Sequence, residues 1–337
     1  MKTIDLRSDT VTRPDDAMRA VMAAAEVGDD VFSEDPTINR LEKMTADLLG
    51  TETAIFAPSG TQSNLLALLS HCARGDEYIV GQQAHTYRYE GGGAAVLGSI
   101  QPQPIELEED GTLDLDSVAS YIKPDDFHFA RTSLLCLENT QAGKALPMDY
   151  LSRASAFARK KDLSIHLDGA RIFNAAVKMD VEPTEIARHF DTVSVCLSKG
   201  LGAPVGSLLC GPRSIIDEAR KWRKMLGGGM RQAGIVAAAG IYALENNRLR
   251  LAEDHDNAGL LAKGLAEIDK IRVSFHPLQT NMVYVTIAPK DAERLASFLN
   301  NQGISILPGS TLRLVTHRDV NRQDIDFVID VVKKFYA

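Results

Sequence analysis

The sequence predicts an α/β fold, with a mostly parallel central sheet in a large domain and a small C-terminal α+β domain. The first observation is that short apolar runs, typical of buried strands, alternate with helical patterns through about residue 247. The second is a change near Arg248, where a long polar helix precedes short strands and helices in mixed order. We therefore expect an arm at residues 1–19, a large domain at 20–247 and a small domain at 248–337.

The individual elements follow from these patterns. Apolar runs predict strands at Thr53–Phe56, Tyr78–Gly81, Leu134–Leu137, Ser164–Leu167, Thr192–Leu197 and Ser207–Cys210. Helical spacing predicts helices at about Thr61–Cys72, Met148–Lys160, Pro212–Leu226 and Arg231–Leu244. The C-terminal part is expected to contain a helix to about Ile268, strands at Asn281–Ile287, Ile304–Leu307 and Thr311–Val315, and helices at Asp291–Asn300 and from Arg322.

Composition narrows the class of protein. The chain has 337 residues, and its 37 Lys and Arg against 45 Asp and Glu give a net charge of −8. Nucleic-acid binders need a basic surface, so we expect no nucleic-acid partner. No apolar run approaches the roughly 20 residues of a membrane span, and the N-terminus lacks a signal-peptide pattern. The four cysteines show no metal-binding spacing. These features predict a cytoplasmic protein with no membrane partner.

Two polar residues follow predicted strands. Lys199 follows Thr192–Leu197 and precedes a glycine turn, and Asp168 follows the strand Ser164–Leu167. Taken alone, each is also typical of an ordinary strand end or helix cap. Open α/β folds bind ligands at the carboxyl ends of their strands. A lysine and a carboxylate placed there are the pair that pyridoxal phosphate requires. The lysine forms a Schiff base, and the carboxylate keeps the pyridine nitrogen protonated.

Two further segments suit the cofactor's phosphate. Ser59, Gly60 and Thr61 stand between the strand Thr53–Phe56 and the next helix, where free N–H groups and hydroxyls bind anions. This pattern is also that of an ordinary helix N-cap. A glycine run at residues 227–229 precedes Arg231, a second candidate for an anion contact. A flexible loop between helices explains that run equally well.

Three other side chains are candidates for the same site. Arg171 lies just past the Asp168 turn, where it could reach the cofactor's phenolate oxygen or a substrate carboxylate. His85 follows a predicted strand, and its flat ring could stack on the cofactor. His128 is a second candidate histidine. A lone histidine is more often structural, so this alternative stays open for both.

Two patterns resemble other sites and are set aside. The segment Gly200–Gly206 contains glycines like a dinucleotide-binding turn, but Pro204 interrupts the helix that would have to start there. The cluster Glu253-Asp254-His255-Asp256 looks like metal ligands, but on a polar helix we interpret it as a solvated face. We therefore expect no metal site.

Taken together, these motifs resemble the threonine aldolase family, of the low-specificity L-type, within the aspartate-aminotransferase-like, fold-type I group of pyridoxal-phosphate enzymes. The resemblance covers essentially the whole chain. Its segments are residues 5–12 (DLRSDTVT), 27–30 (VGDD), 58–61 (PSGT), 167–171 (LDGAR), 198–207 (SKGLGAPVGS), 228–232 (GGMRQ) and 313–317 (RLVTH). The chain departs from the usual pattern at Phe32-Ser33 and at Gln141-Ala142, which bears on substrate preference and rate.

The resemblance implies a role for each matching residue. The cofactor would be pyridoxal 5'-phosphate, bound in the large domain. The implied cofactor-binding residues are Lys199, Ser59, Gly60, Thr61, His85, Asp168, Arg171 and Arg231. The implied catalytic residues are Lys199, His85, His128 and Asp168, and Ser8, Arg171 and Arg313 would bind the substrate carboxylate. Arg231 would serve the neighbouring subunit, which implies a homo-oligomer, a tetramer built as a dimer of dimers with shared sites.

The resemblance also implies a reaction. A carbon–carbon lyase of this kind would cleave L-threonine, L-allo-threonine and other β-hydroxy-α-amino acids to glycine and an aldehyde, serving threonine catabolism and glycine biosynthesis. The base that takes the β-hydroxyl proton would be His85 or His128. The alternative is another fold-type I pyridoxal-phosphate enzyme, such as a β-eliminating lyase or an aminotransferase.

Overall fold

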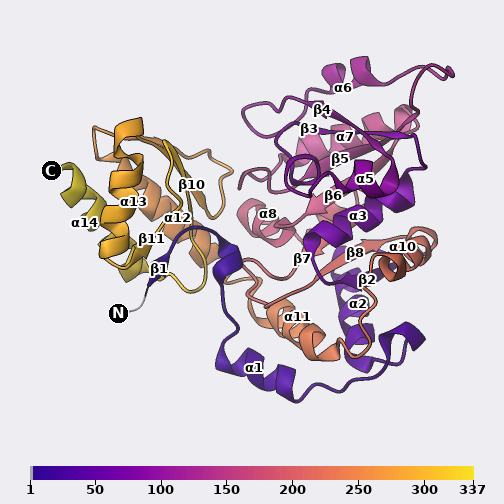
Figure 1. Cartoon of the computed structure of the whole chain (residues 1–337), viewed down its shortest axis with the longest axis horizontal. Helices are drawn as coiled ribbons and strands as arrows, with labels where there is room; N and C mark the ends of the chain where they lie inside the picture. The colour runs from indigo at the N-terminus through magenta and orange to yellow at the C-terminus, as the bar shows by residue number, and fades with distance from the viewer. Residues whose placement is uncertain (1–2) are drawn as a thin grey trace.

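The computed structural model describes residues 3–337 (Figure 1). Its largest sheet has seven strands in the order β2-β8-β7-β6-β5-β3-β4. The pairs from β7 to β4 are parallel, and β8 runs antiparallel to both of its neighbours. The strands are β2 (Thr53–Ala57), β3 (Glu77–Gly81), β4 (Gln101–Ile105), β5 (Thr132–Glu138), β6 (Ser164–Gly169), β7 (Thr192–Cys196) and β8 (Ser207–Gly211). The predicted α/β class is confirmed.

Apolar side chains cover both faces of this sheet. Along β5, Leu135 and Leu137 join the main hydrophobic core, whereas Leu134 and Cys136 join a second core on the other face.

Among the described residues, no helix has the length and apolar character needed to cross a bilayer. The helices of this part are α1 (Asp16–Ala23), α2 (Pro36–Leu49), α3 (Gly60–His71), α4 (His85–Arg88), α5 (Gly93–Gly98), α6 (Leu115–Tyr121), α7 (Met148–Lys160), α8 (Ile172–Met179), α9 (Pro183–Ala187), α10 (Arg213–Met225) and α11 (Gly234–Asn246).

The C-terminal part is a smaller α+β unit with its own core, seen on the left of Figure 1. Its antiparallel sheet has the order β12-β10-β9. Three helices pack with it. The elements are α12 (Leu251–Ala266), β9 (Arg272–Ser274), β10 (Met282–Thr286), the short helix η3 (Pro289–Asp291), α13 (Ala292–Asn301), β11 (Ile304–Ser305), β12 (Thr311–Val315) and α14 (Arg322–Tyr336).

The N-terminal segment contacts both parts of the molecule. The short strand β1 (Ile4–Asp5) pairs in parallel with β11, and the 3-10 helix η1 (Asp9–Val11) follows it. Helix α1 then packs against α11, below the large sheet in Figure 1. Residues 1 and 2 of the expected arm lie outside the described residues. The division of the chain at residues 20 and 248 stays a prediction.

Several elements were not predicted. Strand β4 contains Pro102 and Pro104, which argue against a strand, but β4 is the edge strand, where proline is tolerated. Helix α2 was missed although it carries strong end signals: Asp35 caps it, Pro36 begins it and Gly50 ends it in the left-handed conformation, with φ of 66°. Strand β11 is shorter than the expected run, since pairing with β1 involves only two residues.

Candidate active site

Two predicted residues meet at the carboxyl edge of the central sheet. Asp168 lies at the end of β6, in register with Glu138 at the end of β5, and Lys199 follows the neighbouring strand β7. The Lys199 ammonium is close enough to Asp9 and Glu138 for its charge to act on both carboxyls. The turn after Lys199 needs glycine, because a Cβ on Gly200 would come within 2.9 Å of Leu251. The sheet therefore gathers an amine and several carboxylates at one edge.

The Asp168 carboxylate is buried, with both oxygens held. Its Oδ2 accepts from Asn64 Nδ2 at 2.9 Å, and its Oδ1 accepts from the backbone N–H of Ala170 at 3.0 Å. Asn64 lies on α3 and its amide also donates to Glu90 at 2.9 Å. Donors to both oxygens fix the orientation of the carboxyl group at the edge of the sheet.

His85 is fixed by two carboxylates. Its Nδ1 donates to Glu90 Oε1 at 2.8 Å, and its backbone N–H donates to Glu138 Oε2 at 2.7 Å. The hydrogen bond to Glu90 raises the pKa of His85. Burial and the nearby charge of Asp168 raise the pKa of Glu138 to about 7. The ring thus has a fixed direction and a proton affinity set by its neighbours.

Sequence reasoning missed three members of this cluster: Asn64, Glu90 and Glu138. Glu138 ends a strand in the same way as Asp168, so the strand-end rule could have found it. Asn64 and Glu90 carry no such signal. Asn64 lies in the first turns of a helix and Glu90 follows a short one, so only the packing of α3 against β6 brings them together.

The first turn of α3 fits a phosphate group. Ser59 caps the helix, where its Oγ accepts from the backbone N–H of Gln62, and Gly60 and Thr61 begin the helix. The buried Oγ of Ser207 and Oε1 of Gln62 have no hydrogen-bond partner. The predicted glycine turn lies close by, because a Cβ on Gly228 would collide with Gln62. The Ser207 hydroxyl is a free donor beside Gly60 at the helix N-terminus, as expected of an anion site, whereas the Gln62 oxygen can only accept.

The N-terminal segment reaches this edge through Asp9. Asp9 is fully buried and accepts two hydrogen bonds from Arg171, at 2.6 and 2.8 Å. Burial alone would raise its pKa, but the Arg171 guanidinium holds the pKa at about 2. Asp9 already occupies two N–H groups of Arg171. The predicted contact of Arg171 with cofactor or substrate therefore has to use its other N–H groups.

Ser8 and Arg313 lie around the same segment. Ser8 caps the short helix η1. Arg313, on β12, donates to the backbone oxygen of Arg7 at 3.2 Å and faces Tyr284 across the strand pair. The charges of both Arg313 and Arg171 act on the Tyr284 hydroxyl, so the two guanidiniums approach one region from different parts of the fold.

Arg231 and His128 lie apart from this cluster. Arg231 pairs with Asp29 at 2.9 Å, and its side chain is 56% exposed. His128 pairs with Asp126 at 2.6 Å on an exposed loop before β5, which places it at the amino edge of the sheet rather than the carboxyl edge. Within one chain the structure does not bring these two residues to Lys199.

The patterns set aside give one correction. Residues 200–206 form a loop leading into β8, with no helix after the glycines. The expectation of a solvated face at residues 253–256 is wrong for Asp254, which is completely buried and ion-paired with Arg250 at 2.5 Å. Elsewhere, among the described residues, atoms of His85, Glu90 and Asp168 lie within 4.8 Å of one another in a metal-like group, but they are the hydrogen-bonded cluster described above.

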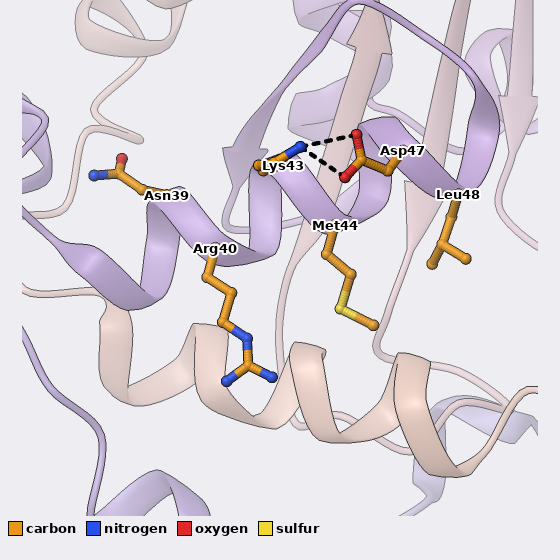
Figure 2. A pocket seen from close by; sticks show the side chains of 6 residues that line it. All are labelled: Asn39, Arg40, Lys43, Met44, Asp47 and Leu48. Atoms are coloured by element: carbon orange, nitrogen blue, oxygen red, sulfur yellow. Dashed lines mark hydrogen bonds and ion pairs between the residues drawn. The ribbon is translucent and has the colours of Figure 1, made fainter.

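A separate hollow lies on the outer side of α2, away from this edge (Figure 2). In Figure 2, Met44 and Arg40 point toward the neighbouring helix, and Lys43 pairs with Asp47. None of the predicted site residues lines this hollow, so we assign it no part in the chemistry. Its lining residues are Asn39, Arg40, Lys43, Met44, Asp47 and Leu48.

Comparisons with known proteins give the class and the family of this protein. The family model described as Beta-eliminating lyase matches residues 5–288, a range that contains Lys199 and the Asp168 cluster. The class of the protein is therefore a lyase.

Individual relatives narrow the class. The Low specificity L-threonine aldolase of Escherichia coli K12 is 57% identical over 336 residues, covering 99% of both chains. A Probable low-specificity L-threonine aldolase 2 of Arabidopsis thaliana is 44% identical and covers 100% of this chain and 98% of its own length. A threonine aldolase structure from Leishmania major shares the fold, with a TM-score of 0.85, 21% identity and coverage of 99% and 100% of the two chains. The chain belongs to the threonine aldolase family, as the motifs suggested.

The cofactor of this lyase is pyridoxal phosphate. The residues present fit it: an amine at Lys199, a buried carboxylate at Asp168, and the unpaired Ser207 hydroxyl beside the N-terminus of α3. These groups are spaced along the same sheet edge, which matches a ligand with a carbonyl, a ring nitrogen and a phosphate.

Proposed function

We propose that this protein cleaves L-threonine and L-allo-threonine, and other β-hydroxy-α-amino acids, to glycine and an aldehyde. The observation that carries the proposal is Lys199 and the hydrogen-bonded Asp168 at neighbouring strand ends, in a chain 57% identical to a low-specificity L-threonine aldolase. A β-eliminating lyase or an aminotransferase on the same scaffold is the alternative.

Each cofactor-binding residue suits a different part of pyridoxal phosphate. Lys199 attaches the cofactor through its amine, and Asp168 holds a proton at the pyridine nitrogen. Ser59, Gly60 and Thr61 bind the phosphate at the positive end of α3. When bound, pyridoxal phosphate accepts the electron pair that is released as the Cα–Cβ bond of the substrate breaks.

The substrate carboxylate is bound where the N-terminal segment meets β12. The groups that bind it are the Arg313 guanidinium, the Ser8 hydroxyl and the N–H groups of Arg171 that Asp9 does not use. We expect a carboxylate bound there to leave the amino group near Lys199 and the β-hydroxyl near His85.

His85 would stack on the cofactor ring, and it is the first candidate for the base. Its Nδ1 is occupied by Glu90, so Nε2 is the atom available to take the β-hydroxyl proton, directly or through a water. His128 is the second candidate, and in this role it has to come from a neighbouring subunit.

We further propose that the working form is a homo-oligomer, a tetramer assembled as a dimer of dimers. Phe127 is 92% exposed and lies against His128 on a loop that projects from the sheet, a position that suits docking on a second copy. In that assembly Arg231 exchanges Asp29 for the phosphate held by the neighbouring chain. The proposal also includes a cytoplasmic location, a part in threonine catabolism and glycine biosynthesis, and the division into residues 1–19, 20–247 and 248–337.

The experiment is an aldehyde-release assay on the purified protein with L-threonine, L-allo-threonine and both D-forms, together with its visible spectrum. We expect a yellow protein that forms acetaldehyde and glycine from the L-forms only. A yellow protein that forms pyruvate, or transfers the amino group, would move the function to the alternative. A colourless protein that pyridoxal phosphate cannot reconstitute would contradict the proposal.

A further inference from the structure

A continuous chain of hydrogen bonds runs from the amino edge of the central sheet to Asp168. His71 Nε2 lies 2.8 Å from Thr192 Oγ1, which lies 2.8 Å from His166 Nδ1. His166 Nε2 lies 3.3 Å from Asn64 Oδ1, and Asn64 Nδ2 donates to Asp168 at 2.9 Å. Four side chains thus connect the far edge of the sheet with the carboxylate that faces the cofactor.

The chain is enclosed between α3 and the sheet. His71 and Asn64 come from α3, Thr192 begins β7, and His166 precedes Asp168 by two residues on the same face of β6. Thr192 and His166 are completely buried and Asn64 is almost so. Asn64 and His71 are seven residues apart on one helix, so the chain extends about 10 Å along its axis.

The direction of the chain follows from the chemistry of its members. A carboxylate only accepts, so Asn64 presents its NH₂ group to Asp168 and keeps Oδ1 as an acceptor. A neutral imidazole has one N–H, so the tautomer of His166 that donates from Nε2 to Asn64 Oδ1 accepts at Nδ1. In this tautomer the Thr192 hydroxyl donates to His166 and accepts from His71. Every hydrogen of the chain then points toward Asp168.

Both histidine rings of the chain are neutral. Burial lowers the pKa of His166 to about 3 and the pKa of His71 to about 4, so both rings are neutral at pH 7. Hydrogen bonds in series within a low-dielectric interior polarise one another. A merely space-filling set of polar side chains would need no such order.

We propose that His71, Thr192 and His166 are positioning residues: they fix the Asn64 amide against Asp168 and so keep that carboxylate aimed at the cofactor's pyridine nitrogen. The inference rests on the proposed function, because it requires Asp168 to face that nitrogen. The inference adds to the proposed site a layer of residues behind Asn64 that contacts neither substrate nor cofactor.

The test compares Thr192→Val, which has the same shape without the hydroxyl, with Thr192→Ser, which keeps the hydroxyl. Apoenzyme is titrated with pyridoxal phosphate to obtain Kd, and kcat and KM are measured with L-threonine. For Thr192→Val we expect Kd to rise and kcat to fall by about 10-fold each, with KM unchanged, as for other supporting hydrogen bonds behind a functional group. Thr192→Ser should stay close to wild type in all three.

Two further variants keep the test decisive. Thr45→Val removes a buried hydroxyl that bonds only within α2, so it should lose thermal stability without a change in Kd. If Thr192→Val does not fold, His71→Leu breaks the chain at its outer end and should shift Kd the same way. Equal effects of Val and Ser at position 192, or an unchanged Kd, would overturn the proposal. A wild-type protein that binds the cofactor but releases no aldehyde would contradict the proposed function. The role of the hydrogen-bond chain could still be tested through the Kd for pyridoxal phosphate.

Discussion

At the scale of single residues, the proton affinity of His85 depends on one neighbour. The Glu90 carboxyl accepts from its Nδ1 at 2.8 Å, and this hydrogen bond is the main reason that the pKa of His85 is raised. Glu90 is itself held by Asn64, which also holds Asp168. The base and the cofactor's carboxylate partner therefore share a common support.

This arrangement predicts the pH dependence of Glu90→Gln. The amide cannot stabilise the imidazolium as the carboxylate does, so the pKa of His85 falls. Because a base acts in its neutral form, the acid limb of the kcat/KM profile should move to lower pH. The measurement is a pH–rate profile with L-threonine. Glu109→Gln, an exposed residue, serves as the control, and an acid limb that stays in place would remove His85 from the role of base.

At the scale of elements, the segment around η1 is fixed by the Asp9–Arg171 pair. Asn281, just before β10, also donates to Asp9 at 3.2 Å, so one carboxylate joins the arm, the start of α8 and the C-terminal part. Asp9 is completely buried and Arg171 is nearly so, and removing one partner leaves the other charge buried without compensation.

Asp9→Asn should therefore lower the free energy of unfolding by about 3 kcal/mol at pH 7. The pKa of Asp9 is lowered to about 2, so its stabilising effect is complete above its unfolded pKa of about 4 and is lost as pH falls through about 2. Urea unfolding of both proteins should show their difference shrinking over that interval. Asp47→Asn, which breaks an exposed pair, should change stability by less than about 1 kcal/mol. An equal loss in both variants would contradict the assignment.

At the scale of the whole molecule, the proposed assembly divides one active site between two chains. Lys199 would serve its own site and Arg231 the neighbour's. Mixing the inactive variants Lys199→Ala and Arg231→Ala, with subunit exchange, should then restore activity, because each mixed dimer contains one site with both residues intact.

The measurement is aldehyde release by the mixture against each variant alone, with light scattering to follow the assembly. In a random mixture about a quarter of all sites would be intact. Mixing two preparations of Arg231→Ala is the matched control and should restore nothing. A mixture as inactive as its components, after demonstrated exchange, would show that Arg231 does not act in the neighbouring site.

Much of the sheet and part of the site could be predicted from the sequence, because buried strands are apolar runs and a polar residue ends each run at the sheet edge. Strands such as β6 and β7 are continuous apolar runs because both faces are buried, and the polar residue that ends each run marks the sheet edge. That rule found Asp168 and Lys199. It failed for β4, where prolines conceal an edge strand, and it was not applied to Glu138.

The sequence by itself determined the fold class, the family and the pair of residues that define the chemistry, since these depend on local patterns and ordered motifs. Only the tertiary structure decided which side chains support that pair. Asn64 reaches Asp168, Glu90 and His166 by the packing of α3 on the sheet, and Asp9 reaches Arg171 across a separation of 162 residues in the chain. Contacts between distant segments leave no local periodicity, because they arise from how whole elements pack rather than from the spacing of residues within one.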